Sequence, residues 1–181
     1  MKEEFTLTVY SENVVGLLNQ VTTVFTRRHI NIESMTASAS AIKGIHKFTI
    51  VIFTTHEQVE KLVGQIEKRI DVLKAYYFRT NEIVYQEIAL YKVPTKSLLD
   101  GNEVEQLVRK NGARILELTD EYAIIQKTGH KEETQDLYEK LQPYGLTQFT
   151  RSGRVAVNRL KKEPLTTWLK TLTEDRLKVQ A

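Results

Sequence analysis

The stretch FTLTVYSENVVGLLNQVTTVF, residues 5–25, decides the fold because its hydrophobic period changes within one short segment. Its first part alternates apolar and polar side chains, with Phe5, Leu7 and Val9 on one face, as in a half-buried strand. The polar residues 11–13 follow. Apolar side chains then recur at helical spacing, at Leu17, Leu18, Val21, Val24 and Phe25. The stretch therefore predicts a strand, a loop and a helix in direct succession.

The remainder of the first half extends this order to β-α-β-β-α-β. Residues 31–41 are rich in strand formers and small residues, Gly44 marks a turn, and residues 46–53 form an apolar run of strand length. These two strands form a predicted hairpin. A second helical stripe follows, at Val59, Leu62, Val63, Ile66 and Ile70. Residues 72–78 provide the last strand of this half.

The second half repeats the order of elements without obvious residue identity. Asn102 and Glu105 have the spacing of a capping box at the start of a helix, and Asn111-Gly112 is typical of a helix end. The expected elements are a strand over 83–93, this helix, strands over 113–119 and 122–127, a helix ending near Pro143 and a strand from Gly145 onward. The repeat predicts an α+β protein with two ferredoxin-like βαββαβ domains.

The domains are expected to join near residues 80–82, giving a first domain over residues 1–80, a second over 81–158 and a helical tail over 159–181. Domains of this size lie near the lower limit for an independent core, so we expect either oligomerisation or tight pairing of the two halves. In the tail, Pro164 suits the first turn of a helix. Leu165, Trp168, Leu169 and Leu172 share one face of this helix. This face would either dock on its own domain or bind a partner.

Composition narrows the classes of function. The 26 basic and 23 acidic residues give a net charge of +3, too even a mixture to call for a nucleic-acid partner. The absence of cysteine excludes disulfides, thiolate nucleophiles and thiolate metal sites. The chain starts directly with a strand pattern and has no signal peptide or transmembrane run, so we expect a cytoplasmic protein without membrane contact.

The sequence offers no catalytic constellation. The four histidines fall in different predicted elements and form no local metal-binding spacing. The serines lack a GxSxG elbow, and the glycines form neither a GxGxxG motif nor a Walker loop. We therefore predict no catalytic residues and no metal site from these motifs.

The segment at residues 11–18 is the most informative for function, because it places polar residues and a glycine where a strand hands over to a helix. A helix N-terminus presents unpaired N–H groups and can hold a carboxylate. Gly16 would allow close approach of a ligand, Asn13 could hydrogen-bond the charged ends of an amino acid, and Leu17 and Leu18 would supply apolar surface. Alternatively, Asn13 merely caps the helix and Gly16 turns the chain.

Several short stretches carry a resemblance to a known family. In the first half they are Glu12-Asn13, Gly16-Leu17-Leu18, Phe25-Thr26-Arg27-Arg28, Asn31-Ile32-Glu33-Ser34 and Ile70-Asp71-Val72-Leu73-Lys74. In the second half they are Glu87-Ile88-Ala89-Leu90 and Arg151-Ser152-Gly153. On these residues the chain, over about 5–158, resembles the small regulatory subunit of acetolactate synthase (acetohydroxyacid synthase). That family has an N-terminal ACT domain and a C-terminal ACT-like domain.

The resemblance implies feedback inhibition in the biosynthesis of valine, isoleucine and leucine. Small subunits of this family form homodimers in which the ACT sheets join side by side, and an end-product branched-chain amino acid, typically valine, binds between the chains. Carried over by position, one side of this effector site would consist of Asn13, Gly16, Leu17 and Leu18. Asn31 and Ile32 would reach in from the partner chain. Two positions depart from the family pattern: Val15, where proline or a small polar residue is usual, and His29, where a glycine usually ends the helix.

The resemblance also implies a catalytic large subunit as the partner that this chain activates. That partner would carry thiamine diphosphate, magnesium and FAD, while this chain would hold no cofactor. Other classes stay open on the residues alone. A stand-alone tandem-ACT amino-acid sensor or transcriptional regulator lacks support from a helix-turn-helix segment or a basic stripe. An RNA-binding domain would need an aromatic sheet motif that is absent, and a small free-standing enzyme would turn over pyruvate by itself.

Overall fold

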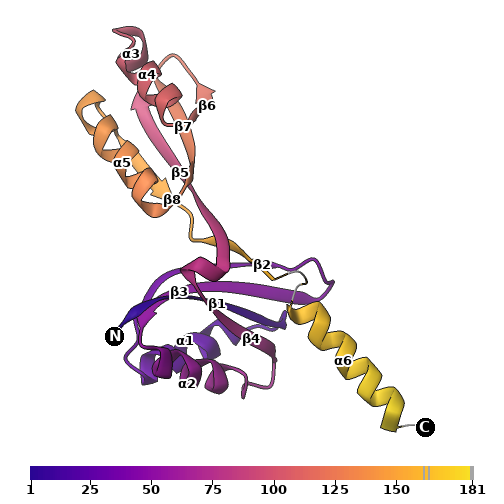
Figure 1. Cartoon of the computed structure of the whole chain (residues 1–181). Coiled ribbons are helices and arrows are strands. Elements are labelled where there is room, and N and C mark those ends of the chain that lie inside the picture. The colour runs from indigo at the N-terminus through magenta and orange to yellow at the C-terminus, as the bar shows by residue number, and fades with distance from the viewer. Residues whose placement is uncertain (161, 163, 180–181) are drawn as a thin grey trace. The chain divides into compact units, whose positions relative to one another are not determined.

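In the computed structural model, strand β1 (Glu3–Glu12) runs through the middle of a four-stranded antiparallel sheet of order β2-β3-β1-β4 (Figure 1). Its neighbours are β3 (Ile45–Thr54) and β4 (Val72–Arg79), and β2 (Ile32–Ala39) pairs with β3 at one edge. This order is that of a ferredoxin-like βαββαβ unit. It confirms the fold predicted for the first half.

Helices α1 (Leu17–Arg27) and α2 (His56–Ile66) lie on the same face of this sheet (Figure 1). A capping box starts α2, because the Gln58 N–H donates to Thr55 Oγ1 at 3.3 Å and the Thr55 N–H donates back to the Gln58 side chain. The apolar faces of the sheet and both helices form the first core: Phe5, Leu7, Val9, Leu17, Val21, Val24, Phe25, Ile30, Phe48, Ile50, Ile52, Val59, Leu62, Val63, Ile66, Val72 and Ala75.

The opposite face of the same sheet is covered by chain from the other end of the protein. Thr6, Thr8 and Tyr10 of β1 are buried, and they line a small hollow together with Ala156 and Pro164. Lys47 Nζ donates to the Ala156 carbonyl at 3.3 Å. Strand β9 (Val155–Asn158) and the start of helix α6 (Pro164–Val179) supply this cover, and the side chain of Leu165 in α6 is fully buried.

The second sheet has the order β6-β7-β5-β8, with β9 also paired to β5, and confirms the second ferredoxin-like arrangement. Its strands are β5 (Ile83–Pro94), β6 (Arg114–Leu118), β7 (Tyr122–Gly129) and β8 (Gln148–Arg151). The helices of this part are α3 (Thr95–Leu99), α4 (Glu103–Lys110) and α5 (Lys131–Leu141). Short 3-10 turns occupy Thr80–Glu82 and Gln142–Tyr144.

Tyr91 anchors the second core. Its ring lies 5.2 Å from the Phe149 ring, and its hydroxyl donates to the Thr134 carbonyl in α5 at 2.6 Å. Burial raises the pKa of Tyr91 to about 12. The remaining buried members of this core are Ala89, Val93, Val104, Val108, Ala123, Ile125, Leu137 and Leu141.

The capping box predicted at Asn102 is wrong. Asn102 is the N-cap residue of α4, but its side chain makes no capping hydrogen bond. Glu105 pairs instead with Arg109 one turn further along the helix. Asn102 has a helical backbone, with φ −96° and ψ 0°, in place of the extended conformation typical of a capping residue. The sequence also did not predict the short helix α3 directly before this point. The predicted helix end is confirmed, because Gly112 has a φ of +60°.

The structure describes residues 1–160, 162 and 164–179. It divides the chain into two compact units. The first comprises Met1–Val84 together with the described chain from Ala156 onward, and the second comprises Tyr85–Val155. The segment from Ala156 to residue 158, which the sequence analysis assigned to the second domain, thus belongs to the first unit together with the tail helix.

Helix α1 ends in a Schellman motif in which a histidine takes the usual place of glycine. The His29 N–H donates to the Thr26 carbonyl at 3.0 Å, and the Ile30 N–H donates to the Phe25 carbonyl at 3.1 Å. His29 has a φ of 53° and is the only non-glycine residue with positive φ in the described chain. A left-handed backbone is unfavourable for residues with a Cβ atom, so this position stores strain.

We therefore expect the substitution His29→Gly to increase the free energy of unfolding by about 1 kcal/mol, because glycine adopts this conformation without the Cβ penalty. Urea denaturation followed by circular dichroism measures the change. His29→Ala is the control, since it removes the imidazole but keeps the strained backbone and should bring no gain. A glycine variant no more stable than the alanine variant would contradict the strain argument.

Candidate functional site

The loop between β1 and α1 leaves the start of the helix open. Gly16 occupies the N-cap position with a φ of 86°, and no side chain caps the helix. The Leu17 N–H donates to the Val14 carbonyl over a long 3.4 Å. Asn13 therefore does not serve as the cap, and the positive end of the helix dipole remains available to an anion.

The predicted site residues of this loop differ in exposure. Asn13 and Gly16 are exposed, and the Leu18 side chain is 46% exposed. Leu17, in contrast, is buried in the first core. Of the two leucines, only Leu18 can offer apolar surface to a ligand, and Leu17 can contribute only its backbone.

The remaining predicted site residues lie at the other end of α1. Asn31 is exposed just before β2, and Ile32 is partly buried against the first core. The helix between Gly16 and this end has 11 residues, which corresponds to a length of about 16 Å. Within one chain, the structure does not bring Asn13 and Asn31 together.

Strand β2 lies at one edge of the sheet, and its register shows which of its ends lies near the loop that holds Asn13. Ala39 at its end pairs with His46 of β3, which pairs in turn with Ser11 of β1. The end of β2 therefore lies at the same end of the sheet as the loop that holds Asn13. In the described part of the chain, β2 pairs only with β3, so it forms one edge of the sheet, where a further strand can add.

Two buried hydroxyl groups near the site were missed by the sequence analysis. The Oγ atoms of Ser11 and Ser34 are buried and have no hydrogen-bond partner in the described part of the chain. Ser11 continues the row of Phe5, Leu7 and Val9, so alternation places it on the face of the sheet that the helices cover. A serine at an apolar position of a strand pattern is the sequence signal that could have identified it.

The structure gives less support to a metal site, a membrane-spanning segment or a site in the hollow between the helices. Among the described residues, no group of three or more histidine, cysteine or acidic side chains is arranged to hold a metal ion. No helix within those residues is long and apolar enough to cross a membrane. A hollow of about 590 Å³ lies between α1 and α2, but none of the predicted site residues lines it.

Comparison with known proteins gives the same family for both halves. Residues 7–74 match the family described as "AHAS small subunit-like ACT domain". Residues 86–160 match the family described as "Small subunit of acetolactate synthase".

Individual relatives agree over most of the chain. The acetolactate synthase small subunit of Bacillus subtilis is 34% identical over 160 residues, which cover 88% of this chain and 91% of that protein. The corresponding small subunit of Mycolicibacterium smegmatis is 32% identical over 154 residues, 85% of this chain and 90% of that protein. The crystal structure of the small subunit from Thermotoga maritima superimposes with a TM-score of 0.80 at 27% identity, covering 88% of this chain and 99% of that one.

The conformation of the loop between β1 and α1 depends on the left-handed backbone of Gly16. We expect Gly16→Ala to lower the free energy of unfolding by about 1–2 kcal/mol, because φ is positive there. A Cβ atom at this position would meet nothing within 4 Å, so the backbone alone accounts for the cost. Chemical denaturation measures it.

Gly64→Ala is the matched control. This glycine lies inside α2 and also has open space around its missing Cβ, so alanine should stabilise the protein by about 1 kcal/mol. Changes of the same sign in both variants would contradict the assignment of strain to Gly16.

Proposed function

Since this chain belongs to the acetolactate synthase small-subunit family, we propose that it is a regulatory subunit that activates the catalytic large subunit and makes it sensitive to a branched-chain amino acid, valine in the first place. The observation that carries the proposal is the uncapped start of α1 beside the exposed side chain of Asn13. An amino acid offers a carboxylate to such a helix start and a charged amino group to a side-chain amide.

The proposed effector site combines residues of two chains. Antiparallel pairing of two β2 edges, related by a twofold axis, sets the beginning of one strand beside the end of the other. The end of β2 lies level with Ser11 and the loop that follows it, so the partner chain's Asn31 would reach this loop. The exposed small residues Ala37, Ser38 and Ala39 leave room along this edge.

Each predicted residue then has a chemical role in holding valine. The N–H groups after Gly16 receive the carboxylate, and the amides of Asn13 and the second chain's Asn31 bind the polar ends. Leu18 and the second chain's Ile32 enclose the aliphatic side chain. The large subunit supplies thiamine diphosphate, magnesium and FAD in this proposal, and this chain contributes no cofactor and no catalytic residue. The complex would work in the cytoplasm.

Calorimetric titration of the purified chain with valine tests the effector site. We expect saturable binding of one valine per chain, lost in Asn13→Ala because the amide that orients the ligand is gone. Asn81→Ala is the matched control, since Asn81 is an exposed asparagine in the 3-10 turn after β4 and should leave binding unchanged. A chain that binds none of valine, leucine and isoleucine would contradict an effector site formed by this chain alone.

Mixing two variants tests whether the site is shared between chains. Asn13→Ala and Asn31→Ala homodimers should each fail to bind valine. After subunit exchange at equal concentrations, mixed dimers contain one intact site, so about a quarter of the wild-type binding capacity should return. If both asparagines act within one chain, no capacity returns.

Turnover measurements test the regulatory role. We expect the purified chain to convert no pyruvate by itself, to increase the rate of its cognate catalytic subunit, and to make that rate fall when valine is added. The Asn13→Ala variant should still activate but should lose the response to valine, because activation does not require an occupied effector site. Acetolactate formation by the isolated chain would contradict the regulatory role.

A further inference from the structure

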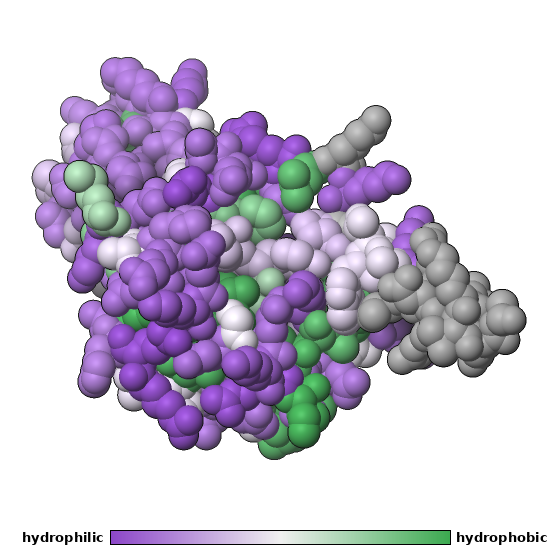
Figure 2. Space-filling model, turned by 60° about the horizontal axis from the view of Figure 1, so that its bottom comes forward, coloured by the Kyte–Doolittle hydropathy of each residue, from purple (hydrophilic) through white to green (hydrophobic). Residues whose placement is uncertain are grey.

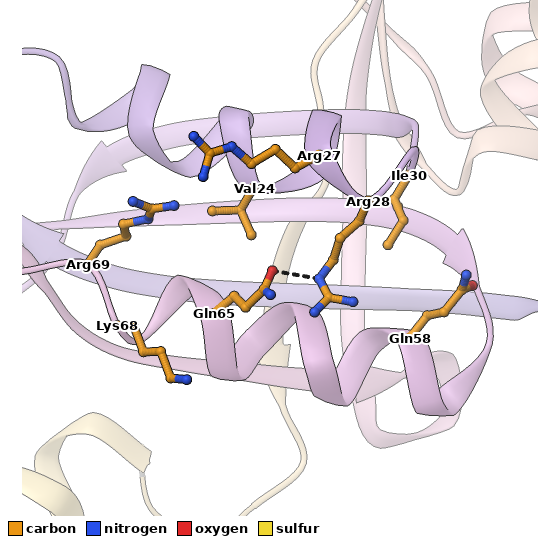
Figure 3. Close-up of a pocket in the computed structure, with 8 residues that line it drawn as sticks. All are labelled: Val24, Arg27, Arg28, Ile30, Gln58, Gln65, Lys68 and Arg69. Carbon is orange, nitrogen blue, oxygen red and sulfur yellow. Dashed lines mark hydrogen bonds between the residues drawn. The ribbon is translucent and has the colours of Figure 1, made fainter.

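A groove lined by basic side chains lies between α1 and α2, apart from the proposed effector site (Figure 3). Two basic residues come from the end of α1 and two from the turn after α2, while α2 adds two side-chain amides and two apolar residues form the floor. In this order they are Arg27, Arg28, Lys68, Arg69, Gln58, Gln65, Val24 and Ile30. The hollow measures about 590 Å³.

The groove concentrates positive charge. No acidic residue lines it, and in the described part of the chain none of the four basic side chains forms an ion pair. The neighbouring carboxylate of Glu67 binds Lys74 instead, at 2.6 Å. Four positive charges exceed the net charge of +3 of the whole chain, so the remainder of the protein carries a slight excess of negative charge.

Stabilisation of helix ends does not account for this arrangement. Basic residues near a helix C-terminus favour the dipole, but they can do so while pointing into solvent. Here side chains from both helices gather around one hollow (Figure 3). The Nε atom of Arg69 is buried without a hydrogen-bond partner, and Arg28 is held in place by a 2.7 Å hydrogen bond from its Nε to Gln65 Oε1. A buried charged donor without an acceptor is costly, so the groove is incomplete as it stands.

We propose that this groove binds a small metabolite carrying a diphosphate group or two phosphate groups. Guanidinium groups match phosphate oxygens with paired hydrogen bonds, and several of them together offset the charge of a multiply charged anion. The Nε–H of Arg69 gains its missing acceptor, and the two glutamine amides supply further donors. The volume lies within the range of small-molecule sites.

The small apolar area of the groove favours a small anion over a broad protein contact. On the face of the protein that Figure 2 turns toward the viewer, hydrophobic residues form separate patches among hydrophilic ones. The apolar part of the groove is confined to Val24 and Ile30, both largely buried at its floor. Such a floor accommodates the uncharged portion of a metabolite. The proposal does not depend on the amino-acid effector, because the groove uses none of the effector-site residues.

Calorimetric titration of the full chain with pyrophosphate tests the proposal, with inorganic phosphate and citrate titrated at the same ionic strength. We expect one pyrophosphate per chain, bound at least about tenfold more tightly than phosphate, which spans fewer guanidinium groups, or citrate, whose charge is divided among three separate carboxylates. The double variant Arg27→Gln/Arg69→Gln should weaken binding by about tenfold or more. Lys68→Gln, which changes only an exposed side chain, should weaken it in the same direction without affecting the fold.

The control variant Lys110→Gln/Lys131→Gln removes the same amount of charge from exposed positions of the second unit and should leave the affinity unchanged. Equal weakening in the control would mean that pyrophosphate responds to overall charge, and it would overturn the proposal. Absence of saturable binding by wild-type protein would also overturn it. In a thermal melt, pyrophosphate should raise the melting temperature of the wild type and not of the Arg27→Gln/Arg69→Gln variant.

Discussion

The burial of β1 on both faces is the constraint on which the first unit depends. Every residue from Phe5 to Ser11 is buried, although a strand in a sheet of this kind usually has one face in water. One row of its side chains packs beneath α1 and α2. The other row, with Thr6, Thr8 and Tyr10, needs a second cover, and residues 156–158 together with Pro164 provide it. The last part of the protein is thereby required to complete the first unit.

This double cover determines where the first sheet can interact. Both faces are occupied, one by helices and the other by the returning chain, so further contacts of the sheet itself must use its edges. The edge at β2 carries small side chains, and a register shift between Ile32 and Ser34 lets both Ile32 and Met35 pack against the core. A second chain pairing along this edge would extend the sheet without disturbing either cover. The effector site proposed above therefore uses the part of the fold that burial leaves open.

The sequence predicted the parts of the structure that follow from local pattern. The period change between Val9 and Leu17 was sufficient for the first strand and helix. The family resemblance indicated that a glycine usually ends this helix, and His29 has the left-handed backbone typical of such a position. Patterns of adjacent residues could not reveal that Ala156 lies against Thr6, because nothing local encodes a contact between the two ends of a chain. The capping box at Asn102 failed because the backbone of Asn102 is helical and not extended, which spacing alone does not reveal.

In the candidate site, too, local sequence patterns predicted some features, and others depend on contacts between distant parts of the chain. Its loop was recognisable from Asn13 and Gly16, since a polar loop before a helix is a local feature. The burial of Leu17 and the unpartnered hydroxyl of Ser11 depend on packing against other elements. The sequence analysis could not predict the basic groove for a similar reason. Its four basic residues come from two segments about 40 residues apart in the sequence. In each segment, the two basic residues alone match the pattern that is common near the C-terminal end of a helix.

Helix α1 physically connects the two proposed binding sites. Its start, after Gly16, faces the effector loop, and its end provides Arg27 and Arg28 to the groove. Since a helix moves largely as one body, a ligand that draws Arg28 away from its bond with Gln65 would also shift the N–H groups at the other end. Thermodynamic linkage then makes the effect reciprocal, so that each ligand changes the affinity of the other by the same factor. Reciprocity holds for any route between two sites, so the structural part of the argument is that α1 contributes groups to both of them.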